Sequence, residues 1–200
     1  IKLLELSNKF NVKLYFNTDS FFNSSNNSYS HLSEYTLSKN HCLDWIKLNN
    51  SPSGSKVINM KIFHMYGEND SITKFIPYII DKIKNEELNV DMTLGEQKRD
   101  FIYVEDVTNA FKIILLNHSK LINYQEFQVG SGKSYSIKYL AQLIKKLTKS
   151  KAKLNFGSIP YRKGEIMESL CDNSKLIEIG WTCNYKLNDG ISKVINHSNK

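Results

Sequence analysis

Two short stretches decide how this chain is interpreted, Leu14-Tyr-Phe-Asn-Thr-Asp-Ser20 and, after a polar loop, Tyr35-Thr-Leu-Ser-Lys39. Residues 12–16 favour a buried strand, and residues 34–49 favour a helix. A tyrosine and a lysine four residues apart share one helix face, where an ammonium favours the phenolate and lowers the pKa of a tyrosine from about 10. The pattern indicates a phenol that exchanges a proton with a sugar or alcohol oxygen, while the Thr18 hydroxyl polarises that oxygen. This is the acid–base chemistry of carbonyl reduction or alcohol oxidation.

The Tyr-x-x-x-Lys spacing alone is weak evidence, because a lysine-rich chain with 11 tyrosines contains such a match by chance. A second match, Tyr78-Ile-Ile-Asp-Lys82, follows Pro77 inside an apolar run and has no strand with a hydroxyl before it. We interpret Tyr78 as a packed tyrosine with a solvated lysine, and Tyr35 as the functional one.

Composition limits the classes of protein to consider. A chain of 200 residues with 40% hydrophobic and 12% aromatic residues can build the core of one domain, or of one and a half. No apolar stretch approaches the roughly 20 residues of a membrane span, so no membrane is expected as a partner. The three cysteines are odd in number and lack metal-ligand spacing, as do the five histidines. We therefore expect reduced thiols, a cytoplasmic location and no metal site.

The net charge of +7 does not predict nucleic-acid binding. The lysines are scattered, their one dense cluster (145–151) resembles the exposed end of a helix, and no nucleic-acid-binding motif accompanies it. The two arginines are more informative, because this sequence uses lysine almost everywhere else for a positive charge. Arg99 and Arg162 are expected where a planar, bidentate group has to hold phosphate or carboxylate, although a structural ion pair is the alternative for each.

Strand and helix patterns alternate along the chain and predict an α/β fold with a mostly parallel, doubly wound sheet. Residues 12–16 and 56–63 should be parallel neighbours joined by the helix that carries Tyr35. Residues 90–94 and 100–103 are expected to form a short strand pair. Further helices are expected at 1–10, 72–84, 105–117, 137–149, 173–179 and 187–196, and a strand at 126–129.

Two known glycine-rich motifs for binding nucleotide phosphates are missing from this chain. Gly130-Ser-Gly-Lys-Ser134 is not a phosphate-binding loop, because Phe127 stands where that motif requires a glycine; it fits a strand-to-helix turn. The chain also lacks a Gly-x-x-Gly-x-x-Gly sequence, the fingerprint that holds a dinucleotide pyrophosphate.

With these motifs placed, the chain resembles the extended short-chain dehydrogenase/reductase family, the NAD-dependent sugar-nucleotide epimerases, dehydratases and reductases. The missing glycine-rich turn suggests a member without the family's first half. Five segments carry the resemblance in the family's order: 17–20, 35–39, 61–67, 95–106, and 161–165 leading to 179–181.

The resemblance implies roles for individual residues. Thr18, Tyr35 and Lys39 match the catalytic set, to which we add the neighbouring Asp19 as a candidate. Tyr35 and Lys39 would also contact the cofactor, NADPH or NAD. Phe63 matches a position at the nicotinamide.

The substrate contacts follow from the same resemblance. Arg99 and Arg162 match the two arginines that bind the nucleotide pyrophosphate, so they should converge on one cleft facing Tyr35. His64 stands where many members have an asparagine near the substrate.

The resemblance also implies a division into domains. Residues 1–66, with a return segment 104–148, would be the carboxyl-terminal part of an NAD(P)-binding Rossmann-type domain. Residues 67–103 and 149–200 would form a smaller domain for the nucleotide-sugar substrate. The resemblance leaves open whether the protein forms a homodimer.

Within the family, 4,6-dehydratases typically have Asp-Glu after the threonine, whereas this chain has Asp19-Ser20, which disfavours dehydration. The run from Asn17 to Lys39 is most similar to CDP-abequose and CDP-paratose synthases, 4-ketoreductases that make dideoxyhexoses for bacterial surface polysaccharide. A sugar-nucleotide 4-epimerase, or a truncated and non-catalytic remnant of such an enzyme, are the alternatives.

Overall fold

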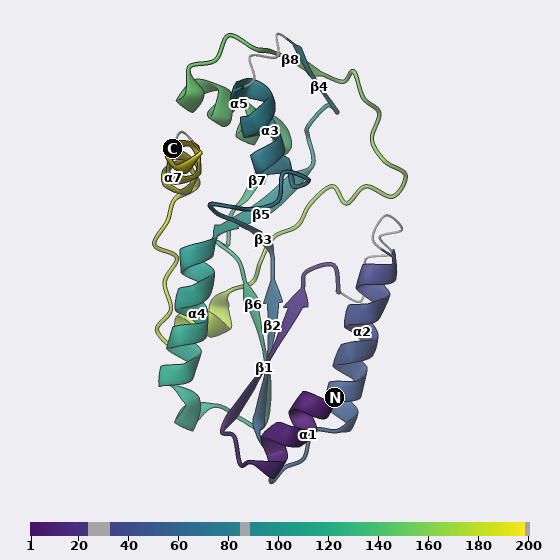
Figure 1. Ribbon diagram of the computed structural model, residues 1–200, viewed down its shortest axis with the longest axis vertical. Helices are drawn as coiled ribbons and strands as arrows, with labels where there is room; N and C mark the ends of the chain where they lie inside the picture. The colour runs from purple at the N-terminus through teal and green to yellow at the C-terminus, as the bar shows by residue number, and fades with distance from the viewer. Residues whose placement is uncertain (24–32, 85–88, 199–200) are drawn as a thin grey trace.

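The computed structural model describes residues 1–23, 33–84 and 89–198. Strands and helices alternate along the chain, with two longer helices, α2 and α4, on either side of the central sheet (Figure 1). The helices are α1 (Lys2–Lys9), α2 (Ser33–Leu48), α3 (Phe75–Lys84), α4 (Val104–Leu116), α5 (Ile137–Thr148), α6 (Ser174–Glu178) and α7 (Leu187–His197), with a 3₁₀ turn at His118–Lys120. The strands are β1 (Leu14–Ser20), β2 (Lys56–Ile62), β3 (His64–Tyr66), β4 (Asn89–Met92), β5 (Lys98–Tyr103), β6 (Tyr124–Val129), β7 (Ser134–Ser136) and β8 (Lys153–Phe156).

The central sheet is parallel, in the order β1-β2-β6. Strand β1 pairs with β2 so that Leu14 lies opposite Lys56 and Thr18 opposite Met60, and helix α2 forms the crossover between the two strands. This confirms the predicted parallel pair with Tyr35 on the connecting helix. However, β1 runs on to Ser20, so Thr18 lies inside the strand and not after it.

Alternating side chains give the central sheet two different faces. On one face Ile58 and Met60 pack in a core with helix α4, and Phe127 and Trp181 belong to the same core. On the other face Val57 packs with α1 and α2. Neighbouring positions on that second face hold buried polar residues, which belong to the site described below.

A second core lies above the sheet, where α3, α5 and α7 pack over β4 and β5 (Figure 1). The expected pairing of residues 90–94 with 100–103 is wrong. Strand β5 pairs with β3 and with β7, and β4 pairs in parallel with β8. The reason is burial: five of the six β5 residues are buried, as in a strand with neighbours on both sides, whereas β4 alternates between exposed and buried residues. Strands β7 and β8 are too short to give a recognisable pattern.

The expected domain boundaries stay a prediction, and the two cores suggest a different division. Helix α5 packs in the upper core, although the return segment 104–148 placed it with the sheet. Leu176 and Trp181 pack in the sheet core, although residues 149–200 were expected in the smaller domain. Helical periodicity identifies a buried face but not the surface that covers it. We propose that the first domain comprises residues 1–66, 104–129 and about 173–183, and the second the remainder.

Candidate active site

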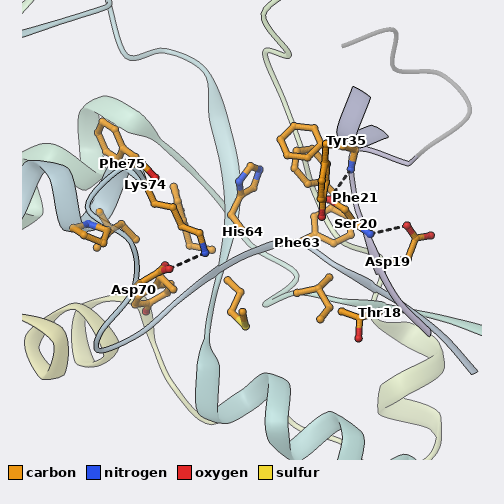
Figure 2. A pocket seen from close by; sticks show the side chains of 18 residues that line it. Thr18, Asp19, Ser20, Phe21, Tyr35, Phe63, His64, Asp70, Lys74 and Phe75 are labelled. Carbon is orange, nitrogen blue, oxygen red and sulfur yellow. Dashed lines mark hydrogen bonds and ion pairs between the residues drawn. The ribbon is translucent and has the colours of Figure 1, made fainter. Parts of the chain in front are cut away.

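A cavity of about 660 Å³ lies where β1 and β2 end and the chain passes to the upper core. Ligands of open parallel sheets bind at this carboxyl edge of the strands. Figure 2 shows residues from the end of β1 on one side of it, His64 in the middle, and residues preceding α3 on the other side. The lining comprises residues 18–22, Tyr35, residues 62–66, Asp70, residues 73–77 and Phe101.

Two of the predicted catalytic residues, Thr18 and Tyr35, line this cavity, and Lys39 contacts both of them. Tyr35, in the first turn of α2, lines the cavity and is 45% exposed. One turn later the ammonium of Lys39 lies 5.8 Å from the centre of the Tyr35 ring and donates a 2.6 Å hydrogen bond to the main-chain oxygen of Thr18. The structure thus brings Thr18, Tyr35 and Lys39 together, although 21 residues separate the first from the last.

The second Tyr-x-x-x-Lys pair has the same local geometry in a different place. The ammonium of Lys82 lies 5.7 Å from the centre of the Tyr78 ring, on helix α3. Tyr78 is not among the residues that line the described cavity. The pair therefore supplies an internal control for the one at Tyr35.

Asp19 is held by hydrogen bonds from the protein itself. The residue is 3% exposed, and its carboxylate accepts from the main-chain nitrogen of Ser20 (2.7 Å) and from the side-chain amides of Asn23 and Asn59 (3.1 Å each). Figure 2 shows this carboxylate directed away from His64 and Phe63. Its partners suit an anchor for the turn after β1 better than a general base.

Asn59 extends this network across the sheet. Its oxygen accepts from Asn17 (2.7 Å), and its nitrogen also donates to Glu126 (2.8 Å). Lys61 forms an ion pair with Glu126 at 3.1 Å. Burial raises the pKa of Glu126, but the donors Asn59 and Lys61 and the charge of Lys61 outweigh it, so the pKa lies below its ordinary value.

Aromatic rings form the wall between the two ends of the cavity. The ring of Phe21 stacks on Phe63 with centroids 5.5 Å apart and lies 4.3 Å from the His64 ring. Burial, and secondarily the positive charge of Arg99, lower the pKa of His64 from 6.5 to about 3. His64 is therefore neutral at physiological pH, with its Nε2 atom 3.2 Å from the Ser169 hydroxyl.

The two arginines do not lie in the cavity. Arg99 is 7% exposed and forms an ion pair with Glu165, and it also donates to the main-chain oxygen of Lys98 at 2.8 Å. Arg162 is exposed, in the turn closed by the hydrogen bond from Glu165 nitrogen to Arg162 oxygen (3.2 Å). Glu165 thus brings the two segments together, but neither arginine lines the described cavity, so their convergence towards Tyr35 remains a proposal.

Several lining residues were not predicted. Phe21 and Phe22 follow β1 directly, and two aromatic residues after a strand that ends in polar groups could have signalled a cavity wall. Lys74 forms an ion pair with Asp70 at 2.8 Å, in the segment that precedes α3. Ser169, which is not among the residues that line the described cavity, also gave no signal, because only the tertiary structure places it beside His64.

Comparison with known proteins assigns the chain to a family. The model of the NAD dependent epimerase/dehydratase family matches residues 1–130. The chain is also 37% identical over 195 residues to the CDP-abequose synthase of Salmonella muenchen, covering 97% of this chain and 66% of that protein. The chain therefore belongs to the NAD-dependent epimerase/dehydratase family. It spans about two thirds of the length of this relative.

Solved structures of low sequence identity share the fold. The UDP-N-acetylglucosamine 4-epimerase of Methanobrevibacter ruminantium superimposes with a TM-score of 0.84 at 23% identity, over 99% of this chain and 66% of that one. The GDP-mannoheptose C4 reductase of Campylobacter jejuni, solved with NADP bound, gives a TM-score of 0.83 at 20% identity, over 99% and 71%. The fold is thus the Rossmann-type α/β fold predicted from the sequence. Within the described residues, every helix is too short or too polar to cross a lipid bilayer.

Proposed function

We propose that the protein is an NAD(P)H-dependent reductase of a nucleotide-linked 4-keto-deoxyhexose, and that its product is a CDP-linked 3,6-dideoxyhexose. The observation that carries this proposal is that Thr18 and Tyr35 line one substrate-sized cavity and that Lys39 contacts both of them. The similarity to CDP-abequose synthase over nearly the whole chain supports the choice of substrate.

In this mechanism Tyr35 is the general acid. Its side chain lines the cavity at the carboxyl edge of β1, where it donates a proton to the C4 oxygen as the carbonyl is reduced. The hydroxyl of Thr18 donates a hydrogen bond to the same oxygen and orients it. The positive charge of Lys39, fixed by its bond to Thr18 oxygen, stabilises negative charge on the phenol and on the reacting oxygen.

The residues at this end of the cavity fit a nicotinamide. Phe63 presents an aromatic side chain to the cavity that Tyr35 also lines, and the Lys39 ammonium lies 5.8 Å from the centre of the Tyr35 ring. Flat apolar surface and a donor suit a nicotinamide and its ribose. We infer that Tyr35, Lys39 and Phe63 hold this end of the cofactor. When bound, NADPH or NADH would supply hydride to C4.

Replacing the phenol tests the proposal. In the full-length protein, Tyr35→Phe should lower the rate of ketosugar reduction by about 10² to 10⁴ if Tyr35 is the general acid. Tyr78→Phe is the matched control and should leave the rate unchanged, because Tyr78 does not line the cavity. Wild-type speed in Tyr35→Phe would exclude the mechanism. No turnover by the wild-type protein would favour the non-catalytic remnant.

A sugar-nucleotide 4-epimerase is the second candidate, and the fold shared with the UDP-N-acetylglucosamine 4-epimerase is compatible with it. An epimerase oxidises and re-reduces C4 with a tightly held NAD⁺, whereas a reductase consumes NADPH or NADH. The purified full-length protein should therefore be denatured and assayed for bound nucleotide. Stoichiometric NAD⁺, with no consumption of added NADPH or NADH by a ketosugar, would favour the epimerase.

A further inference from the structure

The cavity has two polar ends and an apolar middle. Thr18 and Tyr35 lie at one end, and the ion pair of Asp70 with Lys74 lies at the other. Figure 2 shows His64 between these two groups. A ligand that reaches Tyr35 from the other end must therefore pass the middle of the cavity.

This middle is built from contacting rings. Phe21 is central to it: its ring lies 4.0 Å from Phe22, 4.3 Å from His64 and 5.5 Å from Phe63, measured between centroids. The ring of His64 lies 5.7 Å from that of Phe101. The cavity wall next to the end that holds Thr18 and Tyr35 is thus mostly carbon.

His64 contributes little hydrogen-bonding capacity to this wall. Its imidazole is neutral, and one of its two nitrogens faces the Ser169 hydroxyl at 3.2 Å. An asparagine at this position would offer two donors and two lone pairs in a smaller side chain.

A sugar hydroxyl pressed against such a wall loses its hydrogen bonds to water without replacement, which disfavours binding. A hydrogen or a methyl group in the same place is favoured, because it buries apolar surface. Hydrophobic pockets reject an added hydroxyl by up to about 100-fold.

We propose that His64, together with Phe21 and Phe22, selects sugars that carry no hydroxyl on the carbon next to the reacting carbon. This inference rests on the proposed function, because it takes Tyr35 to mark the reacting carbon, C4. His64 is then a specificity-determining residue of this protein. The carbon whose hydroxyl it excludes is C3, because C5 of a hexopyranose carries the ring oxygen.

The test uses two CDP-linked sugars that differ only by a hydroxyl at C3, a 6-deoxyhexose and a 3,6-dideoxyhexose, both with a hydroxyl at C4 so that they bind without being reduced. Affinities for the full-length protein are measured by calorimetry. The wild-type protein should bind the 3-deoxy compound about 10- to 100-fold more tightly.

The variants separate His64 from the rest of the molecule. His64→Asn should reduce this preference by about 10-fold, and Phe22→Tyr, which adds a hydroxyl to the wall, should reduce it in the same direction. His118→Asn, an exposed histidine bound to the main-chain oxygen of Leu115, is the control and should keep the wild-type preference. Thermal melting of each variant shows whether it is folded.

The outcomes distinguish this inference from the proposed function. If the wild-type protein binds both sugars equally, or if folded His64→Asn and Phe22→Tyr both keep the wild-type preference, the assignment to the aromatic wall is overturned. The protein could instead bind the two sugars selectively, in a way that depends on His64, and yet reduce neither of the corresponding 4-ketosugars. That result would support the role of the aromatic wall and reject the proposed reductase.

Discussion

Lys39 on helix α2 donates a 2.6 Å hydrogen bond to the main-chain oxygen of Thr18 in strand β1. This contact fixes the ammonium at the edge of the sheet where the cavity opens. It also ties the helix that carries Tyr35 to the strand that carries Thr18. The geometry of the proposed reaction depends on this one link.

Lys39→Met should therefore impair catalysis more than folding. We expect kcat/KM for ketosugar reduction to fall by about 100-fold or more, because the positive charge beside the phenol is lost. The unfolding free energy should change by less than about 1 kcal/mol, since the hydrogen bond is exposed. Lys82→Met, in the pair with Tyr78, is the matched control. Equal activity of the two variants would remove Lys39 from the mechanism.

Arg99 and Arg162 should respond differently to replacement by lysine. Both changes keep the charge but lose the bidentate geometry, so affinity for the nucleotide sugar should fall by about 10-fold in each, about 1.4 kcal/mol. Arg99→Lys should in addition lower the unfolding free energy by about 1–3 kcal/mol, because it disturbs a buried ion pair with Glu165. Calorimetry and urea denaturation measure the two effects. Unchanged affinity in Arg162→Lys would show that it does not bind the pyrophosphate.

His64 should make the protein sensitive to acid. The pKa of His64 is about 3 in the folded protein, against 6.5 for an ordinary histidine, so the unfolded chain takes up a proton first as the pH falls. The contribution of His64 to stability is complete above about pH 6.5 and declines as the pH drops towards 3. Between roughly pH 6 and pH 4 the slope is about 1.4 kcal/mol per pH unit.

His64→Asn removes this titration and should flatten the dependence of unfolding free energy on pH in that window. Urea denaturation from pH 4 to pH 8 measures it for both proteins. Glu126, whose pKa is also lowered, adds acid sensitivity to both proteins alike. Parallel curves for wild type and variant would mean that His64 titrates normally in the folded protein.

Asn59 should be one of the most sensitive positions of the sheet. It is fully buried and connects Asn17, Asp19 and Glu126, so Asn59→Ala removes one hydrogen-bond partner from each of these three side chains. We expect the unfolding free energy to fall by about 1–3 kcal/mol or more. The exposed Asn188→Ala is the control, with a change within about 0.5 kcal/mol. A similarly small effect at Asn59 would mean that water replaces its contacts.

The sequence was sufficient for the α/β class, the parallel neighbours β1 and β2 and the helix with Tyr35 between them. These follow from local rules: apolar periodicity identifies strands and helices, and a helix between two strands implies a parallel crossover. The four-residue spacing of Tyr35 and Lys39 also fixes their common helix face. The position of Thr18 in the strand before this helix indicated that it is a candidate catalytic residue.

Only the tertiary structure decided the rest, because it depends on contacts between distant segments. No local sequence pattern indicates that β4 pairs with β8, that α5 packs in the upper core or that Ser169 lies beside His64. The carboxylate of Asp19 is identified as an anchor only once Asn59, 40 residues later, is seen to bind it. A sequence states which groups can donate, accept or be buried, whereas the partner of each is set by the packing of the whole chain.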